Sequence, residues 1–257
     1  TGVMAARCHC LGQFTGGTVQ LELIDPLTCE TLSFGPFAAE TRAVAAGPGK
    51  VALLEPDGRL SLLDLQAGEI DFAVVLEKMP PGFNQLSVMP WRDRLLVLAG
   101  RPETTAENQQ YRQLGAISGV RTAGLWDAGQ QLAPLMTGAV WAVDRGTGER
   151  LWSVPATILH HGFDPEQPAD LPVLVFARRI KSPGSTRQPQ LSLLCLDKRT
   201  GSEVLADDRI ATDQHLFYGC EIEASPEDHT VTLTHGARDI TLTFGGQAVS
   251  PRPPYQG

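Results

Sequence analysis

The sequence predicts an all-β fold, a β-propeller of four-stranded antiparallel blades with about five units. Three observations predict it. A turn motif that runs from Asp to Gly recurs along the chain, the first two copies are 39 residues apart, and the apolar runs between turns are short and rich in Val, Leu and Ile. A propeller blade has about 40 residues, and short strands bounded by Gly, Pro and Asp are typical of all-β domains. The predicted fold class therefore follows from the repeated turn motif and its spacing.

The clearest copy of the repeat runs from Ala142 to Trp152 and reads as a strand, a tight turn and a second strand. The side chain of Asp144 can cap the backbone that follows it, and Gly148, after Thr147, accepts the positive φ that reverses the chain. The weaker copies are anchored at Asp197, with Thr200 and Gly201, at Asp64, with Gly68, and, in eroded form, at Asp25. We interpret all four as equivalent turns of successive units.

The first two units are expected in the N-terminal third of the chain. The first is partial, with its early strand within 4–13. The second is the most regular, because each of its short apolar runs is separated from the next by Gly, Pro or Asp, as in Pro56-Asp57-Gly58. Its expected strands are 44–46, 50–54, 60–65 and 69–76.

The later units are longer, because the Asp-to-Asp gaps grow to 80 and 53 residues. We attribute the growth to loops, not to a lost blade. The third unit, 84–154, then carries the insertion 101–137, and the fourth, 157–209, carries the loop 181–190. The fifth is expected to hold strands at 217–223, 230–234 and 239–244. The propeller is thus assigned to 1–245 and a Pro-rich tail to 246–257, and the low number of units indicates part of a larger propeller.

Composition and charge exclude several classes of function. The formal net charge is −8, and Lys and Arg are scattered, which argues against nucleic acid as a partner. No apolar run approaches the roughly 18 residues that a membrane span needs, so we expect a soluble chain. The five cysteines have no C-x-x-C spacing. Cys8 and Cys10 flank His9, but a structural zinc takes four ligands, and we interpret both cysteines as core residues.

No other cluster of polar residues predicts a catalytic or metal site. His160-His161 precedes Gly162 and Pro165, and we interpret this pair as part of a solvated loop. No Gly-x-Ser-x-Gly nucleophile motif is present. We therefore assign no catalytic, cofactor-binding or metal-binding residue.

The pattern Ala-x-Asp-x-x-Thr-Gly-x-x-x-Trp at 142–152 resembles the tryptophan-docking repeat of the pyrroloquinoline-quinone-like propellers. This family includes quinoprotein alcohol dehydrogenases and non-enzymatic outer-membrane assembly lipoproteins of the BamB type. The resemblance implies that Trp152 packs against the neighbouring blade, with Phe72 and Leu205 at the corresponding positions of other units. It also implies a structural role for the motif and no chemistry.

The enzymes of that family resemble one another in a vicinal Cys pair beside the cofactor and in a Glu, Asn and Asp set around a metal. This sequence has no vicinal Cys pair. The resemblance therefore favours a protein without a cofactor and without enzymatic activity. The alternative is a remnant or fragment of a quinone-cofactor oxidoreductase, and a third possibility is a small-ligand or sugar binder that uses a central channel.

We expect a non-catalytic propeller scaffold or protein-binding module of a larger envelope-associated protein, located in the periplasm or cell envelope. Its partner would be another protein or other domains of the same chain. Within the insertion 101–137, side chains of the types enriched at binding hot spots are the candidate partner-binding residues: Tyr111, Arg112, Arg121 and Trp126.

Overall fold

The computed structural model describes residues 9–15, 18–24, 31–102, 135–152, 155–163, 171–180, 190–211, 221–225, 228, 230–235 and 238–243. These residues form β-strands and turns and contain no helix. The strands are β1 (His9–Thr15), β2 (Thr18–Ile24), β3 (Thr31–Ala38), β4 (Arg42–Gly47), β5 (Lys50–Leu54), β6 (Arg59–Asp64), β7 (Glu69–Val75), β8 (Gln85–Trp91), β9 (Arg94–Pro102), β10 (Leu135–Asp144), β11 (Ala156–Phe163), β12 (Val173–Ile180), β13 (Gln190–Asp197), β14 (Glu203–Ala211), β15 (Glu221–Ser225), β16 (Thr230–His235) and β17 (Arg238–Thr243). The chain is all-β.

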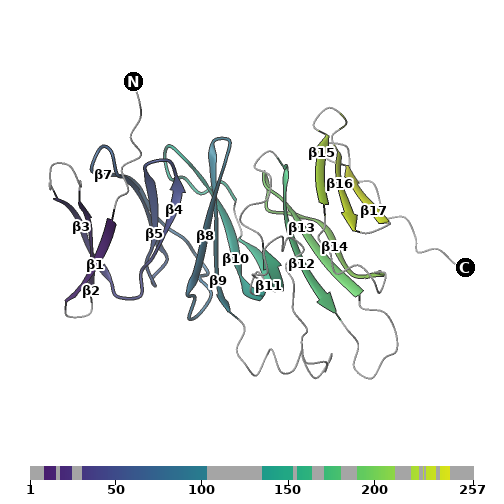
Figure 1. Cartoon of the computed structure of the whole chain (residues 1–257), viewed down its shortest axis with the longest axis horizontal. Helices are drawn as coiled ribbons and strands as arrows, with labels where there is room; N and C mark the ends of the chain where they lie inside the picture. Colours follow the sequence, from purple (N-terminus) through teal and green to yellow (C-terminus); the bar gives the residue numbers. More distant parts are fainter. Residues whose placement is uncertain are drawn as a thin grey trace, which may run out of the picture.

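The strands form four antiparallel sheets, and within each sheet strands that follow one another in the chain are neighbours. Sheet β1–β3 has three strands, sheet β4–β7 four, sheet β8–β14 seven and sheet β15–β17 three. Figure 1 shows the sheets following one another along the long axis, with β1–β3 and β15–β17 at opposite ends. Each described sheet is therefore an antiparallel meander of strands in chain order.

The seven-stranded sheet differs from the expected four-stranded blades. Strand β11 pairs with β10, as in Met136↔His161, and also with β12, as in Phe163↔Phe176. A register shift lies between Met136 and Gly138, and His160 has a φ of 55° in the left-handed region. Such irregularities bend a strand, so one strand joins two predicted units. Among the described sheets, only β4–β7 has four strands, and the blade number stays a prediction.

The strand ends locate the two predicted insertions. Strand β9 ends at Pro102 and β10 begins at Leu135, while β12 ends at Ile180 and β13 begins at Gln190. Residues 103–134, which include Tyr111, Arg112, Arg121 and Trp126, lie outside the described residues, as do Asp25 and the tail 246–257.

Apolar side chains fill the space between successive sheets. Leu63 of β6 packs with Leu21 and Phe34 of sheet β1–β3, whereas Leu62 of the same strand packs with Trp141 of β10 in a second cluster. Neighbouring residues of a strand point to opposite faces of its sheet. Sheet β4–β7 is therefore buried on both faces, and a third cluster, centred on Trp152 and Phe176, continues the core into strands β11–β13.

Contacts between a side chain and a turn glycine of the next unit recur along the row. Trp152 is 3% exposed, and its Nε1 donates a hydrogen bond to the carbonyl of Arg199, 3.0 Å away. A Cβ at Gly201 would lie 2.6 Å from Cε3 of the Trp152 ring, and a Cβ at Gly148 would lie 2.6 Å from Cγ of Phe72. Only glycine admits these ring contacts.

Candidate functional site

The Asp144 turn is held by its own side chain. Oδ1 of Asp144 accepts hydrogen bonds from the N–H groups of Gly146, at 2.9 Å, and Thr147, at 2.8 Å. The Thr147 hydroxyl donates a third, at 3.0 Å. The hydrogen bonds from Thr147 are the main cause of a lowered pKa for Asp144. Gly148, with a φ of 74°, donates its N–H to the carbonyl of Asp144. These hydrogen bonds hold the turn backbone in one conformation.

The Asp64 and Asp197 turns have the same construction. Oδ1 of Asp64 accepts from the N–H groups of Gln66 and Ala67, at 2.7 and 2.9 Å. Oδ1 of Asp197 accepts from the N–H of Arg199, at 2.7 Å. Gly68 and Gly201 have φ values of 72° and 71° and donate to the carbonyls of their aspartates.

The residue after each aspartate ties its turn to an earlier hairpin. The N–H groups of Leu65, Arg145 and Lys198 donate to the carbonyls of Gly49, Asp93 and Pro172, at 2.8, 2.8 and 3.0 Å. The side chains at these three positions have different surroundings. Leu65 packs on the first apolar cluster. Lys198 is buried, with its Nζ 5.8 Å from the centroid of the Trp91 ring. Arg145 is exposed.

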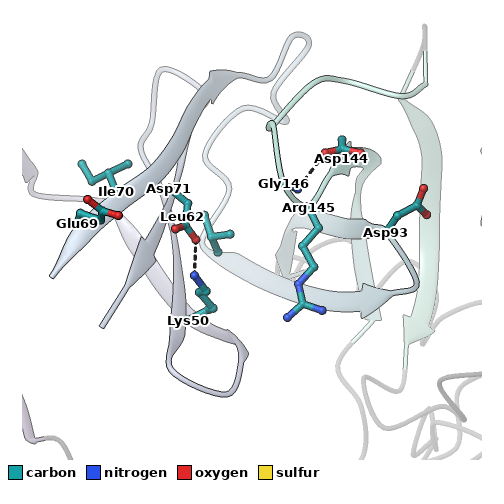
Figure 2. A pocket seen from close by; sticks show the side chains of 9 residues that line it. All are labelled: Lys50, Leu62, Glu69, Ile70, Asp71, Asp93, Asp144, Arg145 and Gly146. Carbon is teal, nitrogen blue, oxygen red and sulfur yellow. Dashed lines mark hydrogen bonds and ion pairs between the residues drawn. The ribbon is translucent and has the colours of Figure 1, made fainter. Parts of the chain in front are cut away.

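A charged groove lies beside Arg145, between sheet β4–β7 and the turns at Asp93 and Asp144 (Figure 2). Its volume is about 740 Å³. The groove is lined by Lys50, Leu62, Glu69, Ile70, Asp71, Asp93, Asp144, Arg145 and Gly146. Figure 2 shows the Arg145 side chain extending from its turn into the space between the two groups of strands.

Charges in the groove are only partly paired. Nζ of Lys50 lies 2.5 Å from Oδ2 of Asp64 and 2.7 Å from Oδ2 of Asp71. The hydrogen bond to Asp64 is the main cause of a raised pKa for Lys50, and the same bond lowers the pKa of Asp64 to about 2. Within the described part of the chain, Glu69 and Arg145 form no ion pair. The groove therefore offers a carboxylate and a guanidinium to a ligand.

Asp93 adds a second carboxylate at the groove. Its side chain is 71% exposed, and its Oδ1 lies 3.5 Å from Nε of Arg94. A pair this exposed contributes little stability. Asp93 is thus available to a cation from outside while its backbone carbonyl holds the Asp144 turn.

The interpretation of His160 and His161 as part of a solvated loop is wrong. They lie in β11 and not in a solvated loop, and His161 is only 7% exposed. Its Nε2 lies 3.1 Å from Oγ of Ser192, and its Nδ1 lies 2.6 Å from the carbonyl of Leu159. His161 is thus a buried residue of a paired strand, and its ring is held by contacts with Ser192 and Leu159.

Sequence reasoning did not find the groove, because its lining comes from segments that are far apart in the chain. One signal was present: Leu65, Arg145 and Lys198 occupy the same place in the repeat, and one is apolar while two are charged. A difference in residue type at this position, which lies between two units, indicates that the units pack differently there. Among the described residues, no group of three His, Cys, Asp or Glu side chains could hold a metal ion, and no helix is long and apolar enough to cross a membrane.

No protein-family model matches the sequence, and no curated protein matches it. Solved structures give partial matches. A europium-containing methanol dehydrogenase is 14% identical, with a TM-score of 0.39, and the match covers 87% of this chain and 46% of that chain. The quinohemoprotein alcohol dehydrogenase from Comamonas testosteroni is 13% identical, with a TM-score of 0.37, over 90% of this chain and 52% of that chain.

The β-propeller domain of Myceliophteria thermophila Cps50 (Swd1) is 11% identical, with a TM-score of 0.34, over 90% of this chain and 68% of that chain. The chain spans about half the length of the two dehydrogenases. All three TM-scores are below 0.5.

Proposed function

We propose that this chain is a non-catalytic β-propeller module that binds a protein partner through the charged groove. The observation that carries the proposal is the composition of the groove. Arg145, Glu69 and Asp93 contribute charges of both signs to the lining, and the apolar Ile70 of the same lining is 45% exposed. Arg is enriched at protein interfaces, which combine an apolar centre with a polar rim.

A protein partner fits this groove better than a small molecule does. Small-molecule sites are mostly apolar cavities that enclose their ligand, whereas this groove is open and six of its nine lining residues are charged. In the turns at Asp64 and Asp144, the aspartate Oδ1 atoms accept hydrogen bonds from backbone N–H groups. Binding therefore orders few main-chain groups, which favours affinity.

The contacts between units support the propeller arrangement. Phe72 and Trp152 each dock on the turn glycine of the next unit, as side chains that link adjacent blades do. Among the described residues, sheets β1–β3 and β15–β17 have three strands each, fewer than the four of a propeller blade. We accordingly propose another protein, or other domains of the same chain, as the partner, and the periplasm or cell envelope as the location.

Site-specific photo-cross-linking tests the proposal. We place p-benzoyl-phenylalanine at position 70, in the groove, and in a matched control at position 159, because Ile70 is 45% exposed and Leu159 is 54% exposed. A cross-linked protein adduct is expected from position 70 and not from position 159. Equal labelling from both positions, or labelling from position 159 alone, would contradict the proposed binding site.

A further inference from the structure

Strand β7 is the outer edge of sheet β4–β7, and no described strand pairs with its free side. Leu76 donates its N–H to the carbonyl of Gly58, 2.8 Å away, and hydrogen-bonded pairs alternate along an antiparallel ladder. Because Leu76 bonds to Gly58, the alternate residues Val74 and Phe72, opposite Leu60 and Leu62, also direct their N–H and C=O groups toward β6. The N–H and C=O groups of Ala73 and Val75, which lie between them, therefore point away from the sheet.

The second half of β7 lacks the features that keep edge strands from pairing. Natural edge strands carry Pro, charged side chains or bulges. Outer strand β3 contains Pro36, and β14 contains Asp207-Asp208-Arg209. Strand β7 has a register shift near Ile70, but 72–75 reads Phe-Ala-Val-Val, and Val75 is 61% exposed. This segment is an unprotected template for another strand.

The other end of β7 enters the charged groove. Glu69, Ile70 and Asp71 line it, and Figure 2 shows Glu69 and Ile70 side by side on this strand. Glu69 forms no ion pair with the residues that the structure describes. A strand that pairs with β7 would bring its own end close to the Glu69 carboxylate.

We infer that β7 is a docking edge for an extended segment of a protein partner, which adds a strand to sheet β4–β7 and places a Lys or Arg side chain beside Glu69. The inference rests on the proposed function and specifies the partner's chemistry. Antiparallel pairing is the more stable form, so the basic residue lies at the C-terminal end of the segment. Main-chain hydrogen bonds supply affinity in this mode, and the side chains supply specificity.

The probe is a fluorescein-labelled peptide of alternating Thr and Val with a C-terminal Lys amide, titrated by fluorescence anisotropy. Ala73→Pro removes an outward N–H that β6 does not use, so the fold is retained, as Pro is tolerated on edge strands. Ala73→Ser is the matched control. We expect Ala73→Pro to weaken binding by about tenfold or more, the effect of one lost hydrogen bond to an ordered strand, and Ala73→Ser to bind like the wild type.

Two further measurements separate the outcomes. A peptide with N-methylated alternate amides is expected to lose binding to the wild-type chain, which keeps the test decisive if Ala73→Pro does not fold. Replacing the peptide's Lys by Glu is expected to weaken binding about fivefold or more. Unchanged binding of the Ala73→Pro variant or of the N-methylated peptide, or no binding of any peptide, would overturn strand addition.

The failure of this inference can be distinguished from failure of the proposed function. If the position 70 adduct persists in the Ala73→Pro variant, a partner binds the groove without adding a strand. If light scattering shows a wild-type dimer that Ala73→Pro converts to a monomer, β7 pairs with a second copy, and the inferred partner is wrong.

Discussion

Arg145 has different surroundings from Leu65 and Lys198, although all three follow a turn aspartate and donate the same backbone hydrogen bond. Leu65 and Lys198 fill the space toward the preceding strands. Arg145 leaves that space open, and the charged groove results. A difference at one side chain thus separates a packed junction from an open, charged groove.

Replacing Arg145 by Leu is expected to weaken capture of the partner by about tenfold or more, as for Arg hot spots in other interfaces. The turn backbone does not need the guanidinium, so the unfolding temperature is expected to stay unchanged. Yield of the position 70 cross-link and a thermal melt measure the two effects. Arg59→Leu, at an exposed site with a 54% accessible side chain, is the control. Equal loss in both variants would contradict a specific role for Arg145.

The pairing of Lys50 with Asp64 predicts a pH dependence. The Asp64 pKa falls from its ordinary value of 3.8 to about 2. A lowered carboxyl pKa contributes stability that is present above 3.8 and is lost as the pH falls toward 2. The difference in unfolding temperature between wild type and Asp64→Asn is therefore expected to be constant above about pH 5 and to shrink below pH 4. A difference that persists at pH 2 would contradict the ion pair.

At the scale of elements, a ring from one unit covers the turn of the next. The sequence predicted a buried ring at Trp152 from the resemblance, and the structure provides its partners, Gly201 and the carbonyl of Arg199. Phe72 has the same relation to Gly148. The partner glycines could not be predicted from spacing alone, because the intervals between units vary with the length of their loops.

Truncation of Trp152 measures the strength of this contact. Trp152→Ala is expected to lower the free energy of unfolding by about 3 to 5 kcal/mol, the cost of removing a large core side chain. Leu151→Ala, at a neighbouring residue that is 37% exposed, is expected to cost less than about 0.5 kcal/mol. Urea denaturation of both variants decides the question. Equal values would show that Trp152 is not a docking residue.

A double-mutant cycle tests the Phe72 contact. Gly148→Ala is expected to destabilise the chain through the left-handed φ of 74°, at about 1 to 2 kcal/mol, and through overlap with the Phe72 ring. In a Phe72→Ala background, only the cost of the left-handed backbone conformation remains. The coupling free energy is expected to be at least about 0.5 kcal/mol, as for residues in contact. Additive effects would mean that the ring and the glycine do not touch.

For the whole molecule, the repeated sequence pattern predicted the secondary structure and the turns, which depend on residues close together in the chain. The Asp-to-Gly turns and short apolar runs predicted an all-β chain, and the described residues are all-β. The seven-stranded sheet was not predicted, because its continuity depends on β11 pairing on both sides. The groove was not predicted, because Lys50 and Arg145 are far apart in the chain and line the same groove only after the sheets pack.

The most direct test of the account is amide hydrogen–deuterium exchange of the β7 residues, measured in the free chain and in complex with the partner that cross-links from position 70. The outward amides of Ala73 and Val75 are expected to exchange at least about tenfold more slowly in the complex, because they then donate to an added strand. Unchanged exchange throughout β7, with protection appearing only at another outer strand such as β14, would contradict the account.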